Sequence, residues 1–177
     1  MHQMDLLCPS EPELRDAYGM FGQGLPAVTW RLLEETSSAA AMVTLGPEGL
    51  IAFDRRAGAG DHTQWRSRLR SEHVPAMIPH AIDALGCGDA ALALATLTLT
   101  AGGAITPSVF LAAAAAAVEA QSLGNIPVGG ADVRRMVNRV HAAHLSFAES
   151  ARVRAEASTA RSALLHGEPA PDTLRSA

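Results

Sequence analysis

A short segment between Asp83 and Asp89 combines two carboxylates with a tight glycine turn. Its sequence is DALGCGD, and the apolar residues after it predict a helix that begins at Asp89. Gly86 and Gly88 leave backbone N–H groups free to face an anion at the start of that helix. A carboxylate there can take a proton from a hydroxyl group while the amides hold the phosphate that the hydroxyl attacks. The pattern therefore indicates phosphoryl transfer to an alcohol.

This segment resembles the DTGAGD signature of the ribokinase-like (PfkB) carbohydrate kinases. The resemblance implies that Asp89, which matches the final acid, is the catalytic base. It also implies that the backbone amides of Gly86, Cys87 and Gly88 form the anion hole for the transferred phosphate. Asp83 matches the leading acid of the signature and is expected to support the site.

Three further segments follow the order expected from this family. Residues 9–13, PSEPE, look like the PNxxE segment, and the match implies that Glu13 organises Mg²⁺ through water in its outer shell. Residues 74–76, VPA, resemble the element that leads into the DTGAGD segment. Residues 43–49, VTLGPEG, are similar to the TxGxxG loop, which implies nucleotide contacts at Thr44, Gly46 and Gly49.

The resemblance implies an α/β fold, a partial ribokinase-like layered fold in which helices flank a central, mostly parallel sheet. It covers roughly residues 4–140, so residues 1–145 are expected to be the C-terminal half of a kinase domain, without the N-terminal sugar-binding half. Residues 146–177 are expected to be a polar, alanine-rich tail, partly helical or disordered. ATP, Mg²⁺ and a sugar or sugar phosphate are the implied cofactors and substrates. The LGCGDA and LGNIPV stretches lean toward the heptose-phosphate kinase branch.

The elements that must position these residues can be predicted from apolar periodicity and from Gly and Pro breaks. Strands are expected at residues 4–8, 39–45 and 50–53 and within 73–79, with a surface loop or hairpin at 57–71. Helices are expected at residues 11–19, 26–36, 89–101, 108–122 and 131–143. Strands mixed with helices in this order favour a layered α/β domain.

Composition narrows the classes of partner. A net charge of −4 and 4% aromatic residues argue against a nucleic-acid surface. No apolar run approaches the length that spans a bilayer, and the N-terminus does not have the pattern of a signal peptide. Cys8 and Cys87 lie far apart with no CxxC pair, which favours a reduced, cytoplasmic setting.

Each acidic residue of the motif has a structural alternative. Asp89 could be the N-cap of the following helix, because Asp is a favoured capping residue. Glu13 could be the third-position member of a capping box with Ser10. Asp83 could hold the loop instead of touching substrate, and we favour this structural role slightly.

The remaining candidates also have alternatives. The glycine loop at residues 43–49 could be only a β-turn. Cys87, at a helix start, could be a nucleophile with a lowered pKa or simply a small, partly buried side chain, and the second interpretation is favoured. His141 and His144 could share a metal, although a solvated helix face is the favoured interpretation.

A second hypothesis concerns the chain as a whole. A chain without the sugar half could be a non-catalytic nucleotide-binding or assembly module, such as one subunit of a split kinase or a remnant. Sheets with helices on both faces keep those faces covered and their edges protected. A partial fold should therefore expose an apolar face or a bare strand, which predicts a homodimer or a partner chain that supplies the missing layer.

Overall fold

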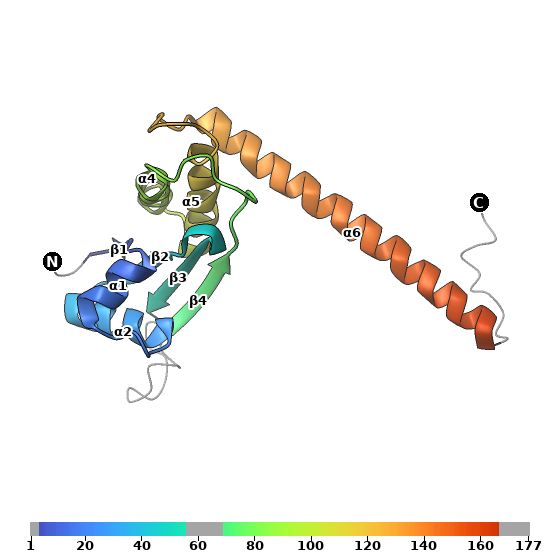
Figure 1. The fold of residues 1–177 in the computed structure, drawn as a ribbon, viewed down its shortest axis with the longest axis horizontal. Coiled ribbons are helices and arrows are strands. Elements are labelled where there is room, and N and C mark those ends of the chain that lie inside the picture. The colour runs from blue at the N-terminus through green and yellow to red at the C-terminus, as the bar shows by residue number, and fades with distance from the viewer. Residues whose placement is uncertain (1–3, 56–68, 167–177) are drawn as a thin grey trace. The chain divides into compact units, whose positions relative to one another are not determined.

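The first of two compact units in the chain contains a four-stranded sheet between two pairs of helices (Figure 1). The computed structural model describes residues 4–55 and 69–166, and its units are Met1–Val137 and Asn138–Ala177. In chain order the elements are β1 (Leu6–Leu7), α1 (Glu11–Tyr18), α2 (Leu25–Thr36), β2 (Ala40–Thr44), the 3₁₀ turn η1 (Gly46–Glu48), β3 (Leu50–Arg55), β4 (Leu69–Val74), α4 (Cys87–Thr100), α5 (Ile105–Glu119) and α6 (Gly130–His166).

The sheet has the order β1-β2-β3-β4, and only its first pairing is parallel. Strands β2 and β3 pair antiparallel, with Val43 opposite Ile51, and β3 and β4 are antiparallel as well. The prediction of a mostly parallel sheet is therefore wrong for the described strands. The reason lies in the connections: α1 and α2 supply the long crossover that a parallel pair needs, whereas β2 and β3 are joined by a short turn that permits only a hairpin.

Side chains alternate between two apolar cores, one on each face of the sheet. On one face, Met42 and Ala52 pack in a cluster that α4 and α5 complete with Ala91 and Val109. On the other face, Val43 and Phe53 cluster with Leu14 of α1 and Val28 of α2. Neighbouring residues of β2 and β3 thus bury toward opposite faces, as strand geometry requires. The sheet is covered on both sides, which confirms the layered α/β arrangement.

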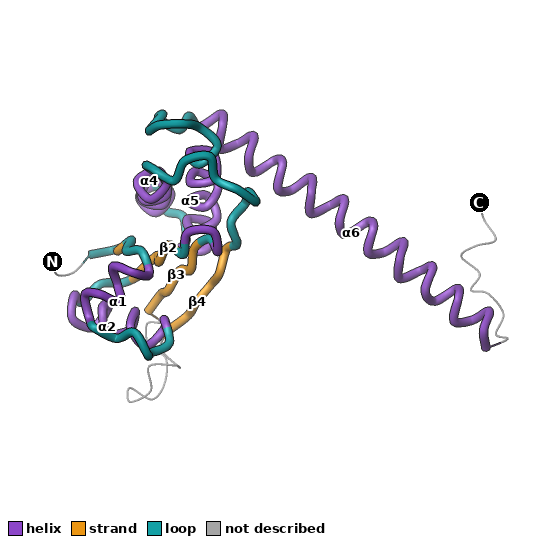
Figure 2. Tube along the Cα trace, viewed as in Figure 1, coloured by secondary structure: helices purple, strands orange, loops and turns teal. Residues whose placement is uncertain are grey.

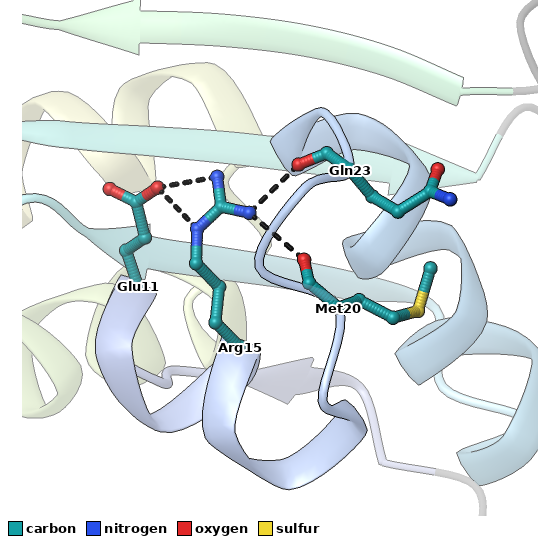
Figure 3. Close-up of polar contacts among 4 residues, drawn as sticks. All are labelled: Glu11, Arg15, Met20 and Gln23. Carbon is teal, nitrogen blue, oxygen red and sulfur yellow. Dashed lines mark hydrogen bonds and ion pairs between the residues drawn. The ribbon is translucent and has the colours of Figure 1, made fainter.

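The first helix is fixed at both ends by local chemistry. Ser10 and Glu13 form the predicted capping box, and Gly19 ends the helix in a left-handed conformation. Arg15 pairs with Glu11 one turn earlier and donates hydrogen bonds to the carbonyls of Met20 and Gln23, at 3.2 and 2.8 Å (Figure 3). One guanidinium group therefore holds the loop between α1 and α2.

Most predicted elements occur, with shifted ends. Helix α4 begins at Cys87, two residues before the predicted start, and α6 runs far beyond the predicted end at residue 143. Strand β4 includes residues 69–71, which composition assigned to a loop. The rest of that predicted loop or hairpin, residues 57–68, lies outside the described residues, as does the end of the predicted tail from residue 167.

The second unit begins inside α6, and its described part is helical from Asn138 to His166. The sequence-based boundary at residue 145 falls within this same helix. Its apolar side chains Leu145, Phe147 and Val153 are exposed. His141 and His144 are exposed too, in line with a solvated helix face. Among the described helices, none combines the length and the apolar character needed to cross a membrane.

Candidate functional site

A cavity of about 480 Å³ lies in the first unit between the β2–β3 turn, the loop after β4, and helices α4 and α5. This volume is in the range of small-molecule sites. The sequence motifs meet here although they are far apart in the chain. Five of the predicted site residues line the cavity: Thr44, Gly46, Gly49, Cys87 and Gly88.

The β2–β3 turn can approach the end of β4 closely because Gly49 has no side chain. Its φ of 98° is unfavourable for any residue with a Cβ. A Cβ there would lie 2.2 Å from the carbonyl oxygen of Val74. Inside the turn, the Leu45 N–H donates to the Gly49 carbonyl at 2.8 Å. The loop is thus a tight turn and also a wall of the cavity, so the structural and the functional interpretations describe the same residues.

The Gly86–Gly88 turn leads directly into α4. Gly86 occupies the N-cap position with φ 83°, and a Cβ there would lie 2.6 Å from Oδ1 of Asn125. The first turn of a helix leaves its N–H groups without acceptors inside the helix. At α4 these groups belong to the segment whose Cys87 and Gly88 line the cavity. An anionic group in the cavity would therefore meet a helix N-terminus, which favours negative charge.

Asp83 fastens the loop before this turn. Its carboxylate accepts hydrogen bonds from the N–H groups of Leu85 and Gly124, both at 3.0 Å. These bonds, that of Leu85 first, lower the pKa of Asp83 below its ordinary value. The contact joins two segments that are distant in sequence, so the described geometry agrees with the loop-holding role that we favoured.

Asp89 lies within the first turn of α4 and is exposed. It is not the N-cap, because Gly86 holds that position, so the capping alternative does not apply. Its carboxylate lies within electrostatic reach of Cys8, which follows β1. Burial raises the pKa of the Cys8 thiol to about 11, and the negative charges of Glu13 and Asp89 add to this effect. Two predicted acids therefore act electrostatically on one thiol.

Glu13 serves the capping box and keeps one oxygen open. Its Oε2 accepts hydrogen bonds from the N–H and the hydroxyl of Ser10, at 2.8 and 2.7 Å. These bonds lower the pKa of Glu13 and keep it ionised. The structural alternative is thus confirmed. Among the described residues both of these bonds end on Oε2, so Oε1 of this exposed side chain can accept a further hydrogen bond.

Cys87 has the properties of a small, partly buried residue. Its thiol donates to the carbonyl of Asp83 at 3.8 Å. Burial raises the pKa of Cys87, and the charges of Glu119 and Asp83 raise it further. A nucleophilic thiol needs the opposite shift, so the nucleophile alternative is not supported.

The sequence analysis did not assign three residues that lie near the site: Glu119, Cys8 and Asn125. Glu119, 3% exposed, is a buried carboxylate that accepts from the Ile126 N–H at 3.1 Å and lies beside Gly86. Its one signal is that it is the charged residue that ends a run of alanines. Cys8 and Asn125 could not be found at all, because only the tertiary fold brings them to the motif.

Comparison with known proteins gives a consistent result at the level of the family. A model of the pfkB family of carbohydrate kinases matches residues 1–128. The bifunctional protein HldE of Azorhizobium caulinodans is 34% identical over 137 residues, which cover 77% of this chain and 26% of that protein. HldE of Alcanivorax borkumensis is 28% identical, and the aligned residues again cover 26% of that protein. The chain thus spans about a quarter of the length of these relatives.

Solved structures share the fold of the chain at low sequence identity. A ribokinase from Thermotoga maritima aligns with a TM-score of 0.61 and 22% identity, over 76% of this chain and 42% of that one. Phosphofructokinase-2 from Escherichia coli, in complex with substrates and products, aligns with a TM-score of 0.64 and 15% identity, over 79% and 42%. These likenesses establish that the layered arrangement of the chain is that of part of a ribokinase-like fold.

Proposed function

Because the chain belongs to the pfkB family of carbohydrate kinases, we propose that it catalyses ATP-dependent phosphoryl transfer to a hydroxyl of a sugar or sugar phosphate. The observation that carries this proposal is the position of the glycine turn. It contributes Cys87 and Gly88 to the cavity wall and is followed at once by the exposed carboxylate of Asp89.

Each predicted residue has a chemical task in this proposal. Asp89 takes the proton of the acceptor hydroxyl. The amides of Gly86, Cys87 and Gly88 stabilise charge on the moving phosphoryl group. The nucleotide lies against the turn that contains Thr44, Gly46 and Gly49. Positioning and electrostatics then supply most of the rate.

The residues present fit an outer-shell role toward Mg²⁺. This ion prefers oxygen ligands and keeps several waters when it binds between carboxylates and phosphates. Glu13 is exposed and ionised, and its Oε1 is available to such a water. When bound, Mg²⁺ would neutralise part of the charge of the nucleotide phosphates.

The sequence gives more information than the fold about the acceptor. The LGCGDA and LGNIPV stretches favour a heptose phosphate over a simple sugar. The two stretches meet where Asn125 lies against Gly86. Heptose phosphates are therefore the first acceptors to test, with simple sugars as the comparison.

A partner is proposed to complete the layer at α4. This helix is apolar on most of its surface, a pattern typical of helices that are surrounded by protein. Even so, Leu92 and Leu97 are exposed. Strand β1, with two residues, ends the sheet. We infer a homodimer or a partner chain that covers this helix and supplies the remaining part of the kinase fold.

Replacing Asp89 by Asn tests the assignment of the base. The variant keeps the shape of the side chain but cannot accept the proton, so turnover should fall by about 10²–10⁴-fold while the affinity for Mg·ATP is retained. Turnover is measured with heptose phosphates and simple sugars, with and without a candidate partner chain, and affinity by titration calorimetry. The matched control is Asp16→Asn, an exposed carboxylate on α1. Equal turnover of Asp89→Asn and the unmodified chain would refute the assignment.

A second candidate function is a non-catalytic nucleotide-binding or assembly module. The chain aligns with 42% of the ribokinase chain, so catalysis by this chain has to be separated experimentally from binding alone. Calorimetry with Mg·ATP separates the possibilities. Heat of binding without turnover, even with a partner chain, indicates a binding module, whereas a silent titration indicates a scaffold or remnant.

A further inference from the structure

The ring of His73, on strand β4, is bonded to the backbone of the β2–β3 turn. Its Nε2 donates a hydrogen bond to the carbonyl oxygen of Glu48 at 2.8 Å. A carbonyl oxygen only accepts, so Nε2 carries the hydrogen both in the neutral ring and in the imidazolium ion. Glu48 is the last residue of η1, which lies where β3 begins and β4 ends (Figure 2). A side chain from another strand therefore holds this turn.

The backbone bonds of the turn join residues that are close in the sequence. The N–H of Glu48 donates to the carbonyl of Leu45 at 3.2 Å, and the N–H of Gly49 donates to the carbonyl of Gly46 at 3.1 Å. Both distances are at the long end of the usual range for N–H···O bonds. Bonds of this kind set the shape of a turn. The bond from His73 also ties the last residue of η1 to a neighbouring strand, so it restricts where the turn lies.

His73 reaches the turn from the face of the sheet that is opposite the cavity. Successive side chains of a strand point to opposite faces. Val74, the next residue, is buried in the cluster that α4 and α5 complete, and residues of these two helices also line the cavity. His73 itself pairs with Ile51 of β3, which packs on the cluster with α1 and α2. The ring therefore lies outside the cavity wall, and any effect on a ligand passes through the turn.

The turn is costly to order because of its composition. Gly46 and Gly49 both have positive φ values, 58° and 98°, and both line the cavity together with Thr44. Glycine loses more backbone freedom on ordering than any other residue. A ligand that needs one conformation of a segment binds more weakly in proportion to the fraction of molecules that lack this conformation. A bond that keeps the turn ordered before a ligand arrives therefore raises the affinity.

We infer that His73 is a positioning residue of the nucleotide site: through Glu48 it keeps the β2–β3 turn in the conformation that the nucleotide meets. The inference rests on the proposed function, which places the nucleotide against this turn. It adds a residue to which the sequence analysis gave no role, one position before the VPA element. The ring is exposed, so the bond should contribute no more than an ordinary neutral hydrogen bond. This corresponds to about a two- to tenfold change in an equilibrium constant.

The test compares His73→Phe with His73→Gln in the full chain, and Kd for Mg·ATP is measured by titration calorimetry. Phe keeps a ring but has no donor, so Kd should rise about two- to tenfold. Gln has an amide N–H that can donate to the same carbonyl, so most of the affinity should return. Strand propensity alone would favour Phe over Gln, which is the opposite order. Equal Kd values for His73→Phe and the unmodified chain, or equal weakening in both variants, would overturn the inference.

The matched control is Ser71→Ala, an exposed residue two positions earlier on the same face of β4, and its Kd should not change. If His73→Phe does not fold by circular dichroism, His73→Leu replaces it, because Leu also lacks a donor.

Hydrogen exchange without nucleotide tests the bond independently of the proposed function. In His73→Phe the amides of Glu48 and Gly49 should exchange about two- to tenfold faster than in the unmodified chain, with no change in Ser71→Ala. Equal exchange rates in His73→Phe and the unmodified chain would overturn the inference. If the unmodified chain does not bind Mg·ATP, the proposed function fails and the role toward the nucleotide fails with it. The exchange rates then still decide whether His73 holds the turn.

Discussion

The carboxylate of Asp89, in the first turn of α4, acts electrostatically on the thiol of Cys8. Cys8 follows β1, near the start of the described residues. Burial, the charge of Glu13 and the charge of Asp89 together raise the pKa of the Cys8 thiol to about 11. The thiol is therefore neutral at physiological pH and cannot repel an anionic substrate. The pKa of this thiol also depends on the charge of Asp89, the proposed catalytic base.

Alkylation of Cys8 should become faster when Asp89 is replaced by Asn. Removing a negative charge favours the thiolate, so the pKa of Cys8 falls and more thiolate is present at a given pH below it. In a Cys87→Ala background, the rate of reaction with iodoacetamide at pH 9 should rise about two- to threefold. Asp16→Asn is the control, because Asp16 is exposed on α1 and is not among the charges that act on Cys8. An unchanged alkylation rate in Asp89→Asn would contradict an electrostatic effect of Asp89 on Cys8.

Replacing Gly49 by Ala should destabilise the protein strongly. The new Cβ would meet the carbonyl oxygen of Val74 at 2.2 Å in a backbone conformation that disfavours a side chain. We expect a loss of about 3 kcal/mol or more in the free energy of unfolding, measured by urea denaturation. Gly22→Ala is the matched control: a Cβ there meets nothing within 4 Å, so its free energy of unfolding should change little. Equal stability of the two variants would rule out the close approach of the turn to β4.

The contribution of Asp83 to stability should disappear in acid. Its folded-state pKa is lowered, so the hydrogen bonds to Leu85 and Gly124 stabilise the fold above the ordinary pKa of Asp, about 4. This stabilisation is lost as the pH falls through the lower, folded-state pKa. Asp83→Asn should therefore lower Tm at pH 7, and the difference from the unmodified chain should shrink toward pH 3. A Tm difference that is the same at both pH values would exclude this linkage.

The exposed leucines of α4 should mediate association. If a second copy covers this helix, light scattering of the unmodified chain at micromolar concentration should give the mass of a dimer. Leu92→Gln with Leu97→Gln should shift the mass toward the monomer, because the covered apolar surface is lost. Leu123→Gln, at an exposed leucine of the loop after α5, should leave the mass unchanged. A monodisperse monomer of the unmodified chain would argue against the homodimer.

Features that depend on neighbouring residues could be predicted from the sequence. The capping box of Ser10 and Glu13, the turn at Gly86 and the start of a helix near Asp89 follow from backbone preferences that act over a few residues. The resemblance to PfkB kinases adds the order of the motifs. The family match over residues 1–128 confirms that resemblance.

Other features depend on which segments, distant in the sequence, pack together in the fold. Composition could not reveal that β2, β3 and β4 pair antiparallel, or that α6 extends to His166, because strand pairing and helix length are set by connections and packing. The hydrogen bond between Gly124 and Asp83, and the electrostatic effect of Asp89 on Cys8, join segments that have no local relationship. The sequence by itself determined the chemical groups and the turn that presents them. Only the tertiary structure decided which groups share a cavity, because proximity across the chain results from burying apolar faces on both sides of the sheet.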